Sequence, residues 1–430
     1  MGEALVAERD RLPTFRAHNE QTMAHAAIAY AKASFRERIM AVSTSIGPGA
    51  TNLVTAAAVA HVNRLPVLLL PGDVFASRRP DPVLQQIESF AQGDVSASDC
   101  FRPVTRYFDR LTRPEQILTA LPRAIQMMTD PANCGPACLS LPQDVQAMAF
   151  DCPESFLQPE LLRFRRPPAD PRELASAAAL LRSARQPLIV VGGGVLYSQA
   201  WDALRAFAEA HGVPVVESHG GKSSLPWDHP LNLGAVGVTG SPAANEIAAN
   251  ADLVLAVGTR LQDFTTGSWT VFAPDARLIG LNAGRQDAAK HQSLAVVGDA
   301  KLGLLALGAA LGDHRADATW LSAAQAHRRT WDAYVAGNVA HGNRPNSYAQ
   351  AIGVVNALCD PRDRVVTAAG GLPAEVTANW RTLGIGTVDV EFGFSCMGYE
   401  IAGGWGARIA QSEAEPDRET IVLVGDGSYL

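Results

Sequence analysis

The chain has 430 residues, of which 47% are hydrophobic and 18% are charged, and its formal net charge at pH 7 is -7. This length allows two or three domains, and the composition is that of a globular protein with a sizeable core. Because acids outnumber bases and the two are interspersed, the sequence argues against a surface that binds nucleic acid or anionic membrane. Small molecules and other protein subunits are the expected partners.

Cellular context follows from what the sequence lacks. The N-terminus has no signal-peptide pattern, and no apolar run reaches the roughly eighteen residues that a membrane span needs. Of the six cysteines only Cys134 and Cys138 lie close together, without a second pair to complete a zinc site. We therefore expect free thiols and a cytoplasmic protein that does not contact a membrane.

A first module, residues 1–152, alternates helical and strand patterns. An Ala-rich helix precedes a βαβ unit whose first strand leads into the glycine turn Gly47–Asn52. The expected helices are 22–33, 53–62 and 114–128, and the expected strands are 39–44, 67–70 and 137–141. Proline- and arginine-rich residues 164–171 predict a linker.

A second module, residues 172–312, repeats strand and helix like a doubly wound, Rossmann-like domain. Its expected elements are the strands 188–191, 213–217, 253–257, 278–281 and 295–297 and the helix 201–211. Residues 313–345 predict a helix and a connector.

Two glycine motifs in this module match known patterns poorly. Gly192-Gly193-Gly194 follows a strand, but Tyr197 stands where a dinucleotide fingerprint needs its third glycine, and His219–Ser223 ends like a phosphate loop but has Val216 where a glycine is required.

A third module, residues 345–430, has the same alternating pattern. The expected helices are 347–358, one that ends at Trp380, and 399–409, and the expected strands are 364–368, 387–391 and 420–424. The last strand is aliphatic throughout, which is typical of a parallel strand buried on both faces. The fold class is therefore α/β, with three successive doubly wound parallel sheets.

The segment after the last strand, Gly425-Asp426-Gly427-Ser428, has the residues of a ligand site. Glycines let the backbone approach a ligand closely, and the carboxylate offers hard oxygen to a cation. Asp426 is thus a candidate metal ligand. Glu20 is a second candidate acid, although a first-turn acid is also explained by the helix dipole.

Taken together, these segments resemble thiamine-diphosphate enzymes of the acetolactate-synthase type. The resemblance rests on Glu20, on Gly47–Asn52, on residues 391–398 (EFGFSCMG) and on the terminal Gly-Asp-Gly-Ser. It covers essentially the whole chain and implies pyrimidine-binding, central and diphosphate-binding domains in that order. Residues 16–32, 221–240 and 391–407 look most like the hydrolases that open trihydroxycyclohexane-1,2-dione in myo-inositol breakdown. That likeness implies a carbon–carbon bond hydrolase whose cyclic dione substrate yields 5-deoxy-glucuronate.

The resemblance also implies cofactors and residue roles. Thiamine diphosphate and Mg²⁺ are the implied cofactors. Glu20 matches the glutamate that hydrogen-bonds the aminopyrimidine ring, and Asp426 matches a magnesium ligand. Met397 matches the residue wedged under the two rings, although a methionine there could equally be core filler. The implied diphosphate cradle comprises Gly370, Gly371, Leu372, Gly425, Gly427 and Ser428, and an ordinary strand-to-helix turn is the alternative for Gly370-Gly371.

Three further expectations follow from the family pattern. The site is shared between subunits of a homodimer or homotetramer. The first domain lacks an initial strand and helix, and the last lacks its C-terminal part, so both are incomplete. The alternatives to a dione hydrolase are an acetolactate-synthase-like carboligase and an inactive truncated fragment that binds thiamine diphosphate weakly or not at all. Candidate substrate contacts are His18, His25, His219 and Lys222.

Overall fold

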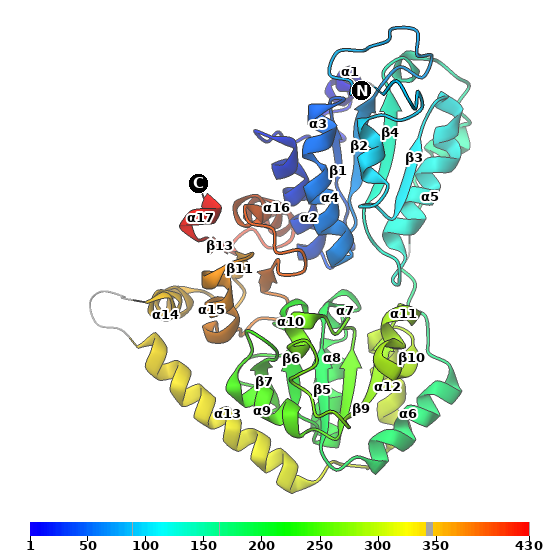
Figure 1. Cartoon of the computed structure of the whole chain (residues 1–430). Helices are drawn as coiled ribbons and strands as arrows, with labels where there is room; N and C mark the ends of the chain where they lie inside the picture. Colours follow the sequence, from blue (N-terminus) through cyan, green and yellow to red (C-terminus); the bar gives the residue numbers. More distant parts are fainter. Residues whose placement is uncertain (88, 163, 341–346, 430) are drawn as a thin grey trace. The chain divides into compact units, whose positions relative to one another are not determined.

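The computed structural model describes residues 1–87, 89–162, 164–340 and 347–429 (Figure 1). Residues 345 and 346, with which the third predicted domain begins, and Leu430 lie outside the described residues. The described chain forms two compact units. One comprises residues 1–164 and 405–410, and the other comprises residues 165–404 and 411–430.

The first unit is built on a four-stranded parallel sheet of order β1-β2-β4-β3. The strands are β1 (Ala41–Thr44), β2 (Leu68–Asp73), β3 (Tyr107–Arg110) and β4 (Ala137–Pro142). The α-helices are α1 (Gly2–Ala7), α2 (Glu20–Ala33), α3 (Pro48–Asn52), α4 (Val54–Asn63) and α5 (Ile117–Thr129). Small side chains let α2 pack closely, since Ala24 to Ala31 are all buried.

The second unit contains a six-stranded parallel sheet of order β10-β9-β8-β5-β6-β7. Counted from β5, this is the strand order of a Rossmann fold, and the sequence had predicted a Rossmann-like module without β7. Its strands are β5 (Pro187–Val191), β6 (Val215–Glu217), β7 (Asn232–Ala235), β8 (Leu253–Val257), β9 (Arg277–Asn282) and β10 (Leu294–Val297). The central strands β5 and β8 are buried throughout, and separate hydrophobic cores cover the two faces of the sheet.

Eight α-helices of the described chain precede, connect or follow the strands of this sheet. They are α6 (Pro171–Ser183), α7 (Gly193–Tyr197), α8 (Trp201–His211), α9 (Pro242–Asn250), α10 (Asp263–Thr266), α11 (Arg285–Ala288), α12 (Ala300–Leu311) and the long α13 (Ala318–Val339). Backbone contact explains the glycines that weakly matched a dinucleotide fingerprint. A Cβ added to Gly194 would lie 2.6 Å from Gly258 Cα, and one added to Gly192 would lie 2.5 Å from Gly258 O. These glycines serve close packing between β5 and β8.

The second unit also contains a three-stranded parallel sheet of order β12-β11-β13. Its strands are β11 (Arg364–Thr367), β12 (Val388–Val390) and β13 (Thr420–Val422). The helices are α14 (Tyr348–Leu358), α15 (Gly371–Asn379), α16 (Tyr399–Ala414), of which Trp405–Ala410 belong to the first unit, and the short α17 (Asp426–Tyr429). All three sheets are purely parallel, which confirms the predicted α/β class. The three sheets fall within the three predicted residue ranges, and the domain boundaries themselves remain predictions.

Two local predictions differ from the structure. Gly47–Asn52 was expected to be a turn, but Pro48–Asn52 form the short helix α3, with Gly47 as its N-cap at φ +66°. Proline at the first helical position favours this start. The last strand was expected to be buried on both faces, yet every residue of β13 is only half-buried. The reason is that β13 pairs with β11 on one side only and so forms the edge of the described sheet.

Among the described residues, all six cysteines are free thiols, and no helix is both long and apolar enough to cross a bilayer.

Buried His25 in α2 gives the first unit a predictable pH response. Burial lowers the pKa of His25 to about 4, below its ordinary value of 6.5, so the folded state resists protonation. The unfolded chain binds the proton first, and stability from neutral His25 is therefore present above pH 6.5 and lost as pH falls toward 4.

We therefore expect the free energy of unfolding to fall by roughly 2 kcal/mol more for the wild type than for H25Q between pH 7 and pH 5. Urea unfolding at both pH values measures this difference. A gap between the two proteins that does not change with pH would contradict the assignment.

Candidate functional site

Three sequence motifs meet at the carboxyl edge of the β12-β11-β13 sheet. Because all three strands run parallel, the segments that follow them leave the sheet from the same edge. Gly370-Gly371 follow β11, residues 391–398 follow β12, and Gly425–Ser428 follow β13. The backbone ladder extends to this edge, since Leu423 N donates to Val366 O at 3.0 Å and Glu391 N donates to Thr367 O at 3.0 Å.

Helix N-termini at this edge suit an anion. α15 starts after Gly370, which has φ +115°, and α16 starts after Gly398, which has φ +88°. The first turn of a helix presents unpaired N–H groups and the positive end of the helix dipole. A Cβ added to Gly371 or Gly425 would meet no atom within 4 Å, so there is open space at these positions. The Leu372 side chain packs on the core of this module, which leaves its backbone for the cradle.

Asp426 is exposed and is the first residue of α17. Ser428 N donates to Gly425 O at 3.1 Å, so the hydroxyl of Ser428 is the group it can offer a ligand. Within the described part of the chain, no three His, Cys, Asp or Glu side chains gather in a way that could hold a metal ion. A lone carboxylate fits Mg²⁺, which protein sites commonly bind through one or two carboxylates, water and the phosphates of a ligand.

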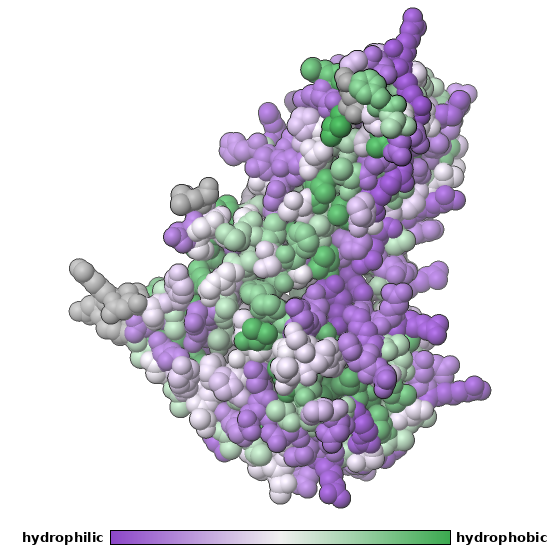
Figure 2. Space-filling view, viewed as in Figure 1, coloured by the Kyte–Doolittle hydropathy of each residue, from purple (hydrophilic) through white to green (hydrophobic). Residues whose placement is uncertain are grey.

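Met397 lies over the same edge. A Cβ added to Gly427 would lie 3.7 Å from Met397 Cε, which brings the methionine against the Gly-Asp-Gly segment. The Met397 side chain is 54% exposed, and Phe394 and Ile401 nearby in the sequence are also exposed. The surface around α16 and α17 accordingly includes white and green residues in Figure 2. This exposure argues against the alternative that Met397 fills a core.

Glu20 lies in the first unit, beside a hollow of its own. Asn19 caps α2 by accepting from Thr22 N at 2.8 Å, which fixes Glu20 in the first turn. Its Oε2 accepts a hydrogen bond of 2.8 Å from Asn52 Nδ2. The side chains and backbone that line the hollow come from Glu20, Ser45, Pro48, Gly49, Thr51, Asn52 and Gln85.

Of the residues that line this hollow, only Glu20 was predicted as a site residue, and two of the others, Asn52 and Gln85, show what the sequence did not reveal. Asn52 lay in the glycine motif but was interpreted as a capping residue, and its contact with Glu20 joins positions 32 apart in sequence. Gln85 carried no recognisable pattern. Its carbonyl lies so close to Gly47 that an added Cβ would be 1.8 Å away, so a side chain at Gly47 would displace this segment.

The four candidate substrate contacts lie in different surroundings. His18 is exposed, whereas His25 is buried within α2. Buried Lys222 donates to Thr377 O at 3.0 Å. His219 stacks on Phe392, the second residue after β12, with ring centroids 4.5 Å apart and planes at 13°.

His219 is neutral at physiological pH. Burial, and secondarily the Lys222 charge, lower the pKa of its imidazole to about 4. Its Nε2 lies 2.7 Å from Thr239 Oγ1, and the half-exposed ring of Phe264 lies 5.5 Å from that of Phe392. The aromatic cluster thus adjoins the segment that carries Met397.

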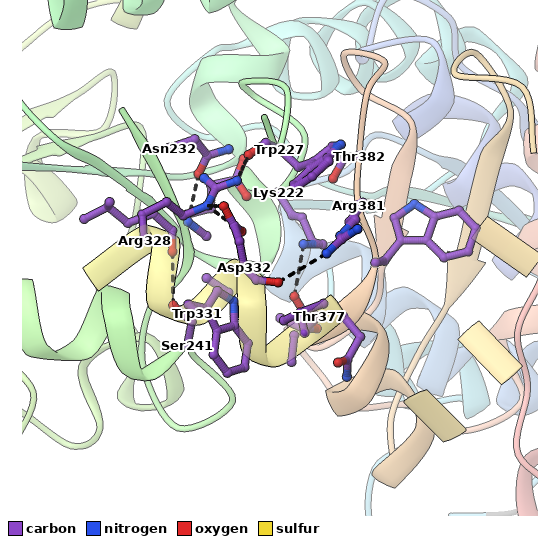
Figure 3. A pocket seen from close by; sticks show the side chains of 18 residues that line it. Lys222, Trp227, Asn232, Ser241, Arg328, Trp331, Asp332, Thr377, Arg381 and Thr382 are labelled. Atoms are coloured by element: carbon purple, nitrogen blue, oxygen red, sulfur yellow. Dashed lines mark hydrogen bonds and ion pairs between the residues drawn. The ribbon is translucent and has the colours of Figure 1, made fainter. Parts of the chain in front are cut away.

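A separate polar pocket lies in the second unit, between β7, α13 and the end of α15 (Figure 3). Its volume of about 40 Å³ has room for a few water molecules, which is too small for a cofactor or a six-membered ring. Lys222 points at Thr377, and the Arg328 guanidinium pairs with Asp332 at 2.7 Å. The Arg381 guanidinium lies 4.5 Å from the ring centre of Trp227.

Buried Glu217 and Lys222 each favour the charged form of the other in this pocket. Burial raises the pKa of Glu217 and lowers the pKa of Lys222, and the charge of each partner offsets part of that shift. Glu217 also accepts from Ser223 N at 3.1 Å. The pocket is therefore a polar contact of β7 and α13 with the C-terminal end of α15, whose other end begins at Gly371.

Comparison with known proteins matches three family models along the chain. These are the N-terminal thiamine pyrophosphate binding domain at residues 3–93, the central domain of thiamine pyrophosphate enzymes at 174–309, and the C-terminal thiamine pyrophosphate binding domain at 370–430. Their order agrees with the three sheets. The fold and the glycine-rich carboxyl edge thus define a thiamine pyrophosphate enzyme.

Comparison with individual proteins identifies a narrower family within this class. The chain is 43% identical to the 3D-(3,5/4)-trihydroxycyclohexane-1,2-dione hydrolase of Geobacillus thermodenitrificans, across 100% of this chain and 70% of that protein. Proteins of the same name from Clostridium perfringens and Bacillus licheniformis are 41% and 42% identical, across 100% of this chain and 71% of each relative. The chain belongs to the thiamine pyrophosphate enzyme family and, within it, to the family of these hydrolases.

Loss of one partner from the buried pair in the polar pocket should be strongly destabilising. K222M removes the stronger of the two positive charges, Lys222 and Arg328, that favour the buried Glu217 carboxylate, and we expect the free energy of unfolding to fall by about 3 kcal/mol or more. Urea unfolding followed by tryptophan fluorescence reports on this region, because Trp227, Trp331 and Trp380 line the pocket.

The control is K301M, which alters the half-buried first turn of α12 and should change stability by less than about 1 kcal/mol. The double variant E217Q/K222M should be more stable than K222M alone, since no charge is then left unpaired. A double variant that is less stable than K222M would show that the pair is not coupled.

Proposed function

We propose that this protein hydrolyses a cyclic 1,2-dione of the kind named for its relatives, 3D-(3,5/4)-trihydroxycyclohexane-1,2-dione, with thiamine diphosphate and Mg²⁺ as cofactors. The observation that carries the proposal is 40–43% identity to such hydrolases across the whole chain. The three thiamine pyrophosphate domains support the cofactor. The expected product is 5-deoxy-glucuronate.

The carboxyl edge of the third sheet fits the diphosphate and its metal. We assign the cradle to Gly370, Gly371, Leu372, Gly425, Gly427 and Ser428. The open space beside Gly371 and Gly425 supports this assignment, as do the helix N-termini. We assign the metal to Asp426, whose exposed carboxylate would be one ligand of a shell completed by diphosphate oxygens, backbone and water.

Glu20 is the proposed catalytic acid–base residue. Its Oε2 accepts from Asn52 Nδ2, which fixes the orientation of the carboxylate, and its Oε1 is then the oxygen that would share a proton with a ring nitrogen of the cofactor's aminopyrimidine. When bound, thiamine diphosphate supplies a carbon nucleophile and an electron sink that make the bond between the two carbonyl carbons breakable. Met397 would support the bent cofactor from below, as its exposed position at the edge allows.

We further propose a homodimer or homotetramer in which Glu20 of one subunit and Asp426 of another serve the same cofactor. Glu20 and Asp426 belong to different compact units of the chain. Support for the shared site comes from the family resemblance.

The discriminating experiment compares two substrates. With thiamine diphosphate and Mg²⁺, the purified protein should hydrolyse the trihydroxycyclohexane-1,2-dione and should form no acetolactate from pyruvate. Acetolactate formation without dione hydrolysis would assign the chain to the carboligases. Activity with neither substrate, from a folded protein, would favour an inactive binding or assembly fragment.

The variant E20Q tests the proposed proton transfer. Because general acid–base groups typically contribute a factor of about 10² to 10⁴, kcat for the dione should fall by roughly 10² or more. E3Q, on the exposed helix α1, is the matched control and should keep the wild-type rate. Equal rates for E20Q and wild type would remove Glu20 from the mechanism.

The variant D426N tests the metal site. An amide is a weaker ligand for a hard cation than a carboxylate, so the Mg²⁺ concentration for half-maximal activity should rise by about tenfold or more. Titration of activity with Mg²⁺ at saturating thiamine diphosphate measures this shift. If the Mg²⁺ dependence of D426N equals that of the wild type, the metal ligand lies elsewhere.

A further inference from the structure

The connection from β12 to α16, residues 391–398, holds an exposed side chain in place without a core around it. Met397 is 54% exposed and Phe394 is 44% exposed, so packing does little to fix their positions. Two backbone conformations in the connection are unusual. Ser395 has φ +58°, which is costly for a residue with a side chain, and Gly398 has φ +88°.

Two buried carboxylates hold this connection from below. Glu391 is 2% exposed, and its Oε1 accepts from Phe394 N at 2.8 Å while its Oε2 accepts from Cys396 N at 2.7 Å. Glu400 is fully buried, and its Oε2 accepts from Gly398 N at 2.9 Å. Three alternate backbone N–H groups of the connection are therefore bound to carboxylate oxygen.

The far end of the connection is anchored as well. Tyr399 is completely buried, and its hydroxyl donates to Asp389 Oδ2 on β12 at 3.1 Å. The thiol of Cys396 is not a competing nucleophile, because burial and the charges of Glu391 and Glu400 raise its pKa to about 11. The carboxylates of Glu391 and Glu400 therefore serve to fix the backbone of residues 394–398.

Burying a carboxylate is expensive unless hydrogen bonds compensate it, and an apolar residue after β12 would suit the core of this module at lower cost. A side-chain amide has only one acceptor oxygen and could not replace the carboxylate. The two oxygens of Glu391 accept from the residues on either side of Ser395. We infer that Glu391 is a positioning residue: its carboxylate fixes the backbone that presents Met397 to the rings of thiamine diphosphate. This inference rests on the proposed function, because it assigns Met397 to the cofactor.

The test compares E391Q, M397A and the double variant E391Q/M397A by calorimetry with two probes. Thiamine diphosphate with Mg²⁺ contacts both the proposed cradle and Met397, whereas inorganic diphosphate with Mg²⁺ can reach the cradle alone. E391Q presents an amide NH₂ to a backbone N–H and so loses one of the two hydrogen bonds. We expect E391Q and M397A each to weaken the binding of thiamine diphosphate by about tenfold. The affinity for inorganic diphosphate should change by less than about twofold.

Non-additivity is the decisive result. Because Glu391 acts through Met397, the double variant should bind thiamine diphosphate within about twofold of M397A alone. Additive losses, or an equal loss for inorganic diphosphate, would overturn the inference and leave the proposed function standing. A wild-type protein that binds neither probe would overturn the proposed cofactor site and this inference with it.

Hydrogen exchange provides a readout that needs no cofactor. In E391Q, exchange should speed up by about tenfold or more at whichever of the Phe394 and Cys396 amides faces the new NH₂ group, because that amide loses its acceptor. E375Q is the matched control, since Glu375 is exposed on α15 of the same module, and these amides should be unchanged in it. E391D, which keeps the charge on a shorter stem, gives a second variant if E391Q does not fold, and it should give an intermediate increase. Unchanged exchange in both Glu391 variants would refute the positioning role.

Discussion

Parallel pairing of β11 with β12 and β13 is the constraint on which the candidate site depends. Parallel strands end at a common edge, so the segments after residues 367, 390 and 422 are brought together although they are far apart in sequence. That edge brings together the glycines after β11 and β13 and the connection after β12 that carries Met397. A slip in register of β12 or β13 on β11 would shift the motif that follows that strand relative to the other two.

The hollow beside Glu20 follows a related logic in the first unit. β1 ends just before Gly47, and α3 begins at once, so Gly49 and Asn52 face the first turn of α2. One carboxylate is oriented there by one amide. Under the proposed function, each unit would carry one kind of chemistry at a strand end: proton transfer beside β1 in the first unit, and charge neutralisation beside β11 and β13 in the second.

The periodicity of the sequence predicted the strongly patterned elements well, including α8 (Trp201–His211) and β8 (Leu253–Val257) at their observed bounds. It missed β3, whose Asp109 and Arg110 break the aliphatic pattern. Arg110 is tolerated in a strand because it pairs with Asp73 at 2.8 Å and Asp99 at 2.6 Å, and those partners are distant in sequence. Glu391 was missed as a functional residue for a similar reason. The Glu391 carboxylate binds backbone N–H groups, which nearly every residue carries, so no residue type in the sequence indicates this contact.

Glycine shows most clearly where sequence reasoning ends. Gly192, Gly194 and Gly258 cannot accept a Cβ because backbone fills the space, whereas Gly371 and Gly425 have open space beside them. In the sequence, glycines of both sets follow strand patterns, and the pattern alone does not show which of them have space beside the backbone. The first set closes the point between β5 and β8 where a Rossmann fold would hold its nucleotide, and the second leaves room for a ligand at the edge of the third sheet. The fold thus retains the Rossmann strand order in its central sheet while its candidate phosphate site lies at another sheet.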